Sequence, residues 1–150
     1  MKQDRSKKIK ASKVDFFYSS LINSLVLFAA TPEYLTSLGD SSFNPIFEME
    51  TEIDYAFTPS IFNKIFEKQL IEEDLKTNLL EFKSKIDKIP SNLWTWDSIC
   101  NNSEWEEIRK EANCLLDNIN IKNKVYNNDF TTIYNSEGII IKNSEFKIKE

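Results

Sequence analysis

Three pairs of a capping residue and a proline divide the first half of the chain into short helices. In Thr31-Pro32, Asn44-Pro45 and Thr58-Pro59, a side-chain oxygen stands where it can accept a hydrogen bond from the first helical turn. The proline that follows suits the first helical position, because its fixed φ is helical and its missing N–H would have no partner there. We expect a helix over residues 14–30, a brief helix over residues 32–38, and two further helices that begin at the later prolines.

Apolar periodicity predicts the remaining helices. Residues at helical spacing follow the two later prolines; they are Ile46, Met49, Ile53 and Ala56, then Ile61, Phe62, Ile65 and Phe66. A third apolar stripe predicts a helix over about residues 72–88, which stops before Pro90. The sequence Ser103-Glu104-Trp105-Glu106 has the pattern of a capping box, so we expect another helix that starts there and runs to about Ile119.

The last part of the chain changes from helical spacing to a strand pattern. β-Branched residues on both sides of a turn that ends at Gly138 predict a β-hairpin over about residues 129–142. A hairpin alone is marginally stable in water, so its apolar face should pack on the helices. The expected fold class is therefore mainly α, a compact single-domain helical bundle with a small C-terminal β-hairpin.

The length of 150 residues suits one domain, with residues 1–12 as a flexible basic tail and residues 13–150 as a single helical domain. The tail and the apolar residues after it imitate a signal peptide. Polar residues interrupt that apolar run, however, and leave only residues 25–30 continuous, which favours a packed amphipathic helix. The sequence therefore predicts a cytoplasmic protein that does not bind a membrane.

Histidine is absent from the chain, which excludes Ser-His-Asp and Cys-His catalysis. The two glycines stand alone, so the chain has no glycine-rich phosphate-binding loop. Cys100 and Cys114 lack metal-ligand spacing and are expected to be reduced and buried, with a disulfide between them as the open alternative. We expect no cofactor, no metal and no small-molecule substrate. The enzyme class that stays open is a carboxylate-dependent one, with two acidic residues facing each other in a pocket.

Charge is distributed unevenly along the chain. Residues 1–13 hold six basic residues and one acidic residue, whereas residues 14–74 hold two basic and eleven acidic residues. Affinity for nucleic acid depends on Lys and Arg, so the acidic part of the chain is not expected to bind nucleic acid directly. A basic protein is the partner that its charge favours.

Within the acidic part, Glu48, Glu50, Glu52 and Asp54 alternate along one predicted helix. Each pair of like charges one turn apart costs roughly 0.2–0.5 kcal/mol. No Lys or Arg occurs in residues 14–63 to relieve the repulsion, which favours a surface kept for a partner. The competing interpretation is a solvated helix face, with Glu48 stabilised by the amino end of its helix.

Two further groups are candidates for the same surface. Glu72, Glu73 and Asp74 form a second acidic run, which is also what the start of a helix favours. Trp94 and Trp96 lie in the short segment before the last predicted helix, and tryptophans are favoured interface anchors as well as core residues. Residues two apart point to opposite sides of an extended segment, so we expect one tryptophan to be buried and the other to be more accessible.

Three segments carry a family resemblance. They are residues 43–57, residues 89–96 with the sequence Ile-Pro-Ser-Asn-Leu-Trp-Thr-Trp, and residues 105–117, which end in Leu-Leu-Asp. Together they resemble small bacterial immunity proteins, more specifically those encoded beside contact-dependent growth inhibition toxins, a class of polymorphic toxin. The resemblance covers roughly residues 14–143 and lies in pattern, size and charge, without a diagnostic motif.

The resemblance implies a cytoplasmic antidote that binds the carboxyl-terminal toxin domain of a delivered effector and blocks its active site. Many such toxins are nucleases, which are basic where they attract phosphate, so a carboxylate-rich inhibitor imitates their substrate. We therefore expect an immunity protein, without catalytic residues, that neutralises a basic nuclease acting on RNA. The alternative is a non-catalytic regulatory or adaptor protein, which binds another basic protein through the same face or through the Trp94/Trp96 segment.

Overall fold

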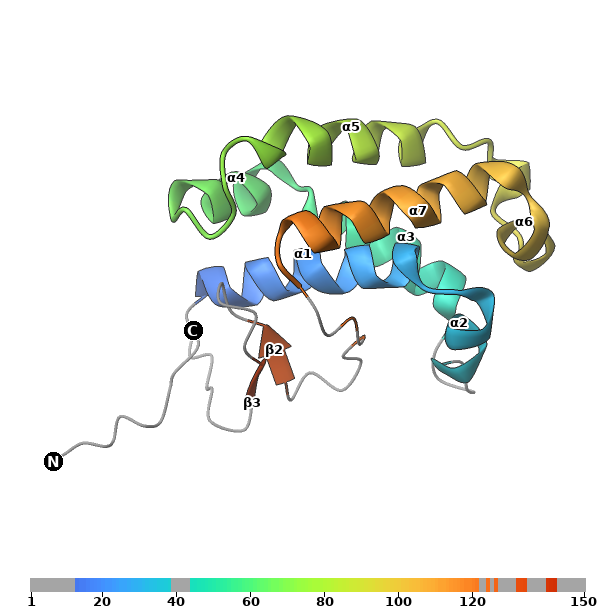
Figure 1. Cartoon of the computed structure of the whole chain (residues 1–150), viewed down its shortest axis with the longest axis horizontal. Coiled ribbons are helices and arrows are strands. Elements are labelled where there is room, and N and C mark those ends of the chain that lie inside the picture. Colours follow the sequence, from blue (N-terminus) through green and yellow to red (C-terminus); the bar gives the residue numbers. More distant parts are fainter. Residues whose placement is uncertain are drawn as a thin grey trace, which may run out of the picture.

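The computed structural model describes residues 13–38, 44–121, 124, 126, 132–134 and 140–142. Within these residues the protein is mainly helical, as predicted (Figure 1). The helices are α1 (Lys13–Ala29), α2 (Pro32–Leu38), α3 (Pro45–Ala56), α4 (Pro59–Glu67), α5 (Leu75–Asp87), α6 (Trp96–Asn101) and α7 (Ser103–Asn118). A 3-10 turn, Ser91–Leu93, lies between α5 and α6. The predicted basic tail, residues 1–12, lies outside the described residues.

Helix α1 is the centre of the core. Between Tyr18 and Ala29, every residue except Ser20 is buried, because α3, α4 and α7 all pack against this helix. The buried residues include Ser24, whose hydroxyl is satisfied because it donates a hydrogen bond to the carbonyl oxygen of Leu21 at 2.8 Å. None of the helices in the described part of the chain has the length and apolar character that crossing a membrane requires.

Aromatic side chains join α1 to α5, α7 and the segment between α5 and α6. The ring of Phe28 stacks on Trp105 and makes edge contacts with Phe82 and Trp94, at centroid distances of 6.1–6.3 Å. Trp105 is 2% exposed and donates its indole N–H to the carbonyl oxygen of Leu93 at 2.8 Å. This buried cluster fixes the position of the chain after α5, which forms one wall of the site described below.

The predicted capping pairs are confirmed at two of three positions. Side-chain oxygens of Thr31 and Asn44 accept backbone N–H groups of α2 and α3 at 3.0–3.2 Å. Thr58 makes no such bond, because its hydroxyl instead donates to the carbonyl oxygen of Asp54 at 3.0 Å. That bond satisfies a carbonyl in the last turn of α3. The Thr58 side chain therefore stabilises the end of α3 and does not cap the start of α4.

The predicted capping box at Ser103 is wrong by one residue. Asn102 is the N-cap of α7, and its side-chain oxygen accepts the backbone N–H of Glu104 at 2.7 Å. Ser103 is already the first helical residue. The asparagine takes the position because the short helix α6, which was not predicted, ends immediately before it and leaves Asn102 in an extended conformation.

Replacement of Asn102 by alanine should therefore lower the free energy of unfolding by about 1 kcal/mol, the usual contribution of an N-cap hydrogen bond. The matched control is Ser103→Ala, which removes a side chain from the adjacent helical position and should change stability by less than half as much. Urea denaturation followed by circular dichroism measures both. A larger loss in the Ser103 variant would mean that Ser103 is the N-cap, as the capping box predicted.

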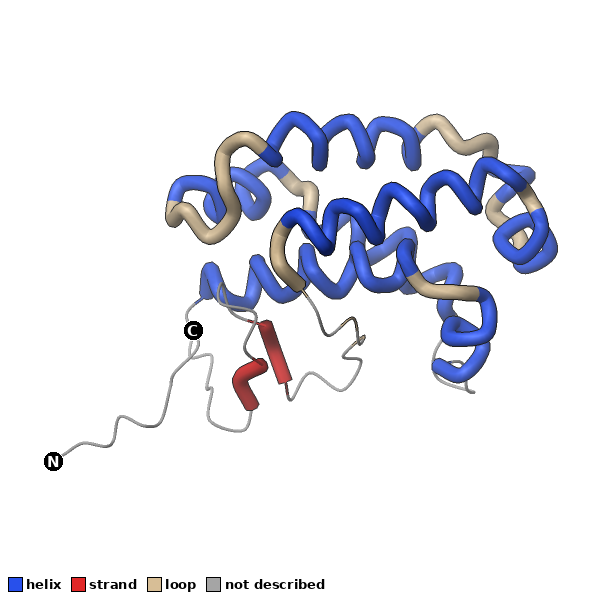
Figure 2. The backbone as a smooth tube through the Cα atoms, in the orientation of Figure 1, coloured by secondary structure: helices blue, strands red, loops and turns tan. Residues whose placement is uncertain are grey.

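Two short strands are described near the carboxyl end. Strand β2 (Thr132–Tyr134) pairs antiparallel with β3 (Ile140–Lys142), with Ile133 opposite Ile141, and β2 lies beside α1 (Figure 2). The other residues of the predicted hairpin, 129–131 and 135–139, lie outside the described residues. The hairpin as a whole, and the packing of its apolar face, therefore stay predictions.

Both cysteines are free thiols, but their predicted burial is only partly correct. Cys100 is partly buried on α6, whereas Cys114 is exposed. Cys114 immediately precedes Leu115 and Leu116, which turn their side chains into the core, and its position in the helix places it on the solvent side.

Candidate functional site

Helix α3 carries the whole predicted acidic cluster and divides it into two pairs. One stripe of the helix is buried against α1, so its remaining residues flank that stripe or face solvent. Glu50 and Asp54 are exposed and lie one turn apart, while Glu48 and Glu52 are partly buried and lie one turn apart on another face. The four carboxylates therefore do not form one continuous acidic surface.

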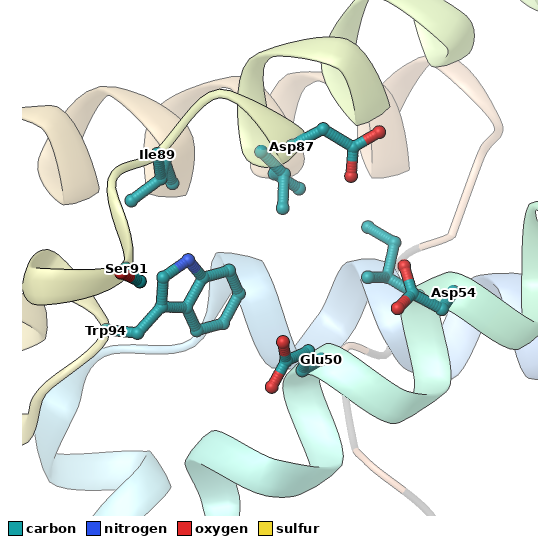
Figure 3. Close-up of a pocket in the computed structure, with 8 residues that line it drawn as sticks. Glu50, Asp54, Asp87, Ile89, Ser91 and Trp94 are labelled. Atoms are coloured by element: carbon teal, nitrogen blue, oxygen red, sulfur yellow. The ribbon is translucent and has the colours of Figure 1, made fainter.

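Glu50 and Asp54 border a cavity of about 400 Å³ between α3 and the end of α5 (Figure 3). Asp87, in the last turn of α5, adds a third carboxylate. The indole of Trp94 extends into the space between Glu50 and the end of α5, and forms a wall of the cavity. The other lining residues are Ile53, Ile86, Ile89 and Ser91.

One lysine holds two of these three carboxylates in place. The ammonium of Lys83 lies 2.7 Å from Asp87 and 3.2 Å from Asp54, so it joins α5 to α3. Partial burial lowers the pKa of Lys83, but the hydrogen bonds and charges of Asp87 and Asp54 outweigh that effect and place the pKa above its usual value. Among the described residues, no Lys or Arg lies within ion-pair distance of Glu50, which remains without a basic counterpart.

The position of Trp94 follows from the sequence around Pro90. Helix α5 ends at Asp87, ahead of Pro90, and the carbonyl oxygen of Pro90 accepts the N–H of Leu93 at 2.9 Å, which closes the 3-10 turn. Trp94 then packs edge-on against Trp105, at a centroid distance of 4.9 Å. One edge of its indole is thus fixed in the core while another part of the ring lines the cavity.

Two large aromatic side chains are exposed on α3 near this cavity. Phe47 is 59% exposed and lies one turn before Glu50, and Tyr55, which is 42% exposed, directly follows Asp54. Exposed aromatic residues are enriched at protein interfaces, where they bury large area at low entropic cost. The outer side of α3 thus combines unpaired acidic charge with apolar contact area.

Within the other acidic pair, Glu52 has a structural role. Tyr126 donates its hydroxyl hydrogen to Glu52 on α3, and its backbone N–H donates to the hydroxyl of Tyr34 on α2 at 3.0 Å, so this residue is bonded to both helices. Burial raises the pKa of Glu52, the Tyr126 hydrogen bond lowers it, and the charge of Glu48 raises it, with a net upward shift from the usual value of 4.5. Burial, together with the bond to Glu52, raises the pKa of Tyr126.

The raised pKa of Glu52 gives its replacement by glutamine a pH-dependent effect. A carboxyl whose pKa is higher in the folded than in the unfolded protein binds its proton more readily when folded, so its ionisation costs stability as pH rises above 4.5. Glu52→Gln removes this cost and keeps an acceptor for Tyr126. The variant should therefore become more stable relative to the wild type between about pH 4 and about pH 7, as measured by urea denaturation at both values.

Tyr126→Phe provides the opposite control, because it removes the hydrogen bond that lowers the pKa of Glu52. This variant should lose more stability at about pH 7 than at about pH 4. The contradicting result is a stability difference between each variant and the wild type that is the same at both pH values. In that case the pKa of Glu52 is not raised in the folded protein.

The second acidic run lies in a different hollow. Glu72, Glu73 and Asp74 line a space of about 440 Å³ beside Phe66, and they share no lining residue with the cavity between α3 and α5. The helix predicted to start at Glu72 begins at Leu75, because the backbone of residues 72–76 forms tight turns in which Glu72 and Glu73 accept from residues three positions later. The two acidic runs therefore belong to separate surfaces.

The tryptophans divide broadly as predicted. Trp94 is partly buried and packs against the core, and Trp96 is 38% exposed at the start of α6. Trp96 does not line the cavity. Thr95 between the two tryptophans is extended, while the 3-10 turn ends before Trp94 and α6 begins at Trp96.

Of the nine residues predicted to bind a partner, the structure brings Glu50, Asp54 and Trp94 to one cavity. Sequence reasoning missed Asp87 and Lys83, because both lie far from α3 in the sequence. A charged residue on a helix is most often solvated, so neither residue stood out. The signal that could have found Asp87 is its place in the last turn before Pro90, close to Trp94. Among the described residues, no group of three or more His, Cys, Asp or Glu is arranged to hold a metal ion.

No protein family, no curated protein and no solved structure matches this chain.

Proposed function

We propose that the protein is an immunity protein that binds a basic toxin domain through the outer side of α3 and the adjacent cavity. The observation that carries this proposal is the grouping of Glu50, Asp54 and Asp87 at one cavity with Trp94, where Lys83 is the one basic residue among those described that pairs with them. A surface with excess negative charge and exposed aromatic residues has the composition of a binding site for a positively charged protein.

A toxin that cleaves RNA supplies the charge that this surface lacks. Its active site must attract phosphate groups and is therefore rich in Lys and Arg. Carboxylates held on a rigid helix occupy such a site as a substitute for phosphate, and long-range attraction between the two surfaces accelerates their association. The inhibitor then acts in the cytoplasm, where RNA is the target, and it needs no cofactor or metal of its own.

A carboxylate-dependent enzyme is the second function that the cavity could serve. Catalysis by two carboxyl groups requires one of them to have a raised pKa, so that it can donate a proton. Glu52 is the α3 carboxyl whose pKa is raised, yet it binds Tyr126 and does not line the cavity. Asp54 and Asp87 are each more than half exposed and share Lys83, which suits binding better than proton donation.

Co-expression tests the proposal directly. The toxin domain encoded by the adjacent effector gene is expressed in a bacterial host with and without this protein, and growth and RNA integrity are measured. The proposal predicts that growth is restored and RNA stays intact only when this protein is present. Binding of the toxin domain without rescue would favour an adaptor protein, and failure to bind it would reject the immunity function.

A further inference from the structure

The cavity between α3 and α5 combines three features that recognise one particular kind of side chain. Its rim carries Glu50, Asp54 and Asp87, and Lys83 contacts only the last two. Three carboxylates and one ammonium leave a net negative charge at the rim, and Glu50 is the carboxylate without an ion pair among the described contacts. A cation that enters the cavity would meet carboxylates from both helices, Glu50 and Asp54 from α3 and Asp87 from α5.

Apolar and aromatic surface lies between these carboxylates. Ile53, Ile86 and Ile89 also line the cavity. The indole of Trp94 forms one wall (Figure 3). A carboxylate rim alone would bind any cation weakly in water, because the charges on both sides are well solvated. An aromatic face next to the carboxylates adds attraction for a cation that can lie flat upon it.

The volume of about 400 Å³ limits the occupant to one side chain or a small molecule. Arginine matches the combination better than lysine does. Its planar guanidinium stacks on an aromatic ring and donates two parallel hydrogen bonds to a carboxylate, while its aliphatic stem covers apolar surface. Lysine offers a more strongly hydrated point charge that does neither as well.

We propose that this cavity receives a single arginine side chain of the partner, which stacks on Trp94 and pairs with Glu50. The inference rests on the proposed function for the source of the arginine, a basic protein, and adds the residue that occupies the cavity. Trp94 is the aromatic wall and Glu50 is the unpaired carboxylate, so the two are the residues that a guanidinium contacts.

The test uses the full chain and small probes that reproduce the side chain alone. N-acetyl-arginine methylamide is titrated into the protein, and the indole N–H signals of its three tryptophans are followed by NMR, with Trp94→Phe used to assign one of them. The neutral isostere N-acetyl-citrulline methylamide and the lysine analogue are titrated in parallel. The arginine probe should shift the Trp94 signal and bind about tenfold more tightly than citrulline and several-fold more tightly than lysine.

A matched pair of variants locates the binding. Glu50→Gln keeps the shape of the side chain and removes its charge, so it should weaken the arginine probe about tenfold. Glu72→Gln makes the same change in the separate hollow beside Phe66 and should leave the affinity unchanged. Equal binding of citrulline and arginine, equal effects of the two variants, or a shift confined to Trp96 would each overturn the inference.

These outcomes are separable from those of the immunity proposal. If the arginine probe fails to bind while the protein still neutralises the toxin domain, the arginine site is rejected and the immunity function stands. If the probe binds at Trp94 but no toxin is neutralised, the arginine site is supported and the immunity function is rejected.

Discussion

Replacement of Glu50 by lysine should weaken binding to the toxin domain by about 3 kcal/mol, a little more than a hundredfold in Kd. The reversal adds an ammonium at the rim of the cavity and cancels the remaining negative charge of its carboxylates, so the cavity no longer attracts a cation. Because Glu50 is exposed and has no described ion pair, its replacement should leave the fold intact. Isothermal titration calorimetry measures the affinity, and thermal denaturation checks the fold.

The matched control for this prediction is Glu67→Lys, which makes the same change of charge at an exposed residue in the last turn of α4. Glu67 lies away from the cavity and contacts Lys64 at 3.7 Å, a surface pair of small energetic value. This control should lower affinity by less than about 1 kcal/mol through long-range charge alone. Equal losses in the two variants would mean that net charge governs binding and that the cavity has no special role.

Replacement of Trp105 by alanine should lower the free energy of unfolding by about 3–5 kcal/mol, the range for a large aromatic residue removed from a core. The side chain is 2% exposed, packs against Phe28 and Trp94, and bonds to the carbonyl oxygen of Leu93. Its loss opens a void and leaves that carbonyl without its indole donor. Denaturation in guanidinium chloride, followed by circular dichroism, gives the change in stability.

The control for the core prediction is Trp96→Ala, which removes the same type of side chain from a position that is 38% exposed. This variant should lose less than about 1.5 kcal/mol, because the side chain is partly in contact with water already and its removal leaves no closed cavity. Trp105→Phe should lie between the two, since it keeps most of the packing and loses the hydrogen bond to Leu93. A Trp96 variant as unstable as the Trp105 variant would contradict the assignment of the core.

Local signals in the sequence predicted the helices well, because the residues that start and end them act on their nearest neighbours. Thr31 and Asn44 cap the helices that follow them, and the apolar stripe of α3 is buried as its spacing requires. The errors are also local in origin. Asn102 and Ser103 are both good N-cap residues, and only the end of the unpredicted helix α6 decides between them.

The candidate site could be predicted only in part, since it depends on contacts between distant segments. Sequence spacing places Glu50 and Asp54 on one side of a helix, but it cannot show that Lys83 relieves Asp54 or that Asp87 faces them both. The same spacing suggested one acidic surface for all four α3 carboxylates. Glu48 and Glu52 instead lie on another face of α3, where Tyr126, a residue far along the chain, binds Glu52.

Hydrogen–deuterium exchange of the protein, free and bound to the toxin domain, locates the interface most directly. An interface at the α3 cavity predicts slower exchange on binding in residues 46–57 and 86–94, with little change in residues 66–74, which border the separate acidic hollow. Protection confined to residues 66–74, or to residues that border neither space, would contradict the assignment of the α3 cavity as the surface that binds a basic partner.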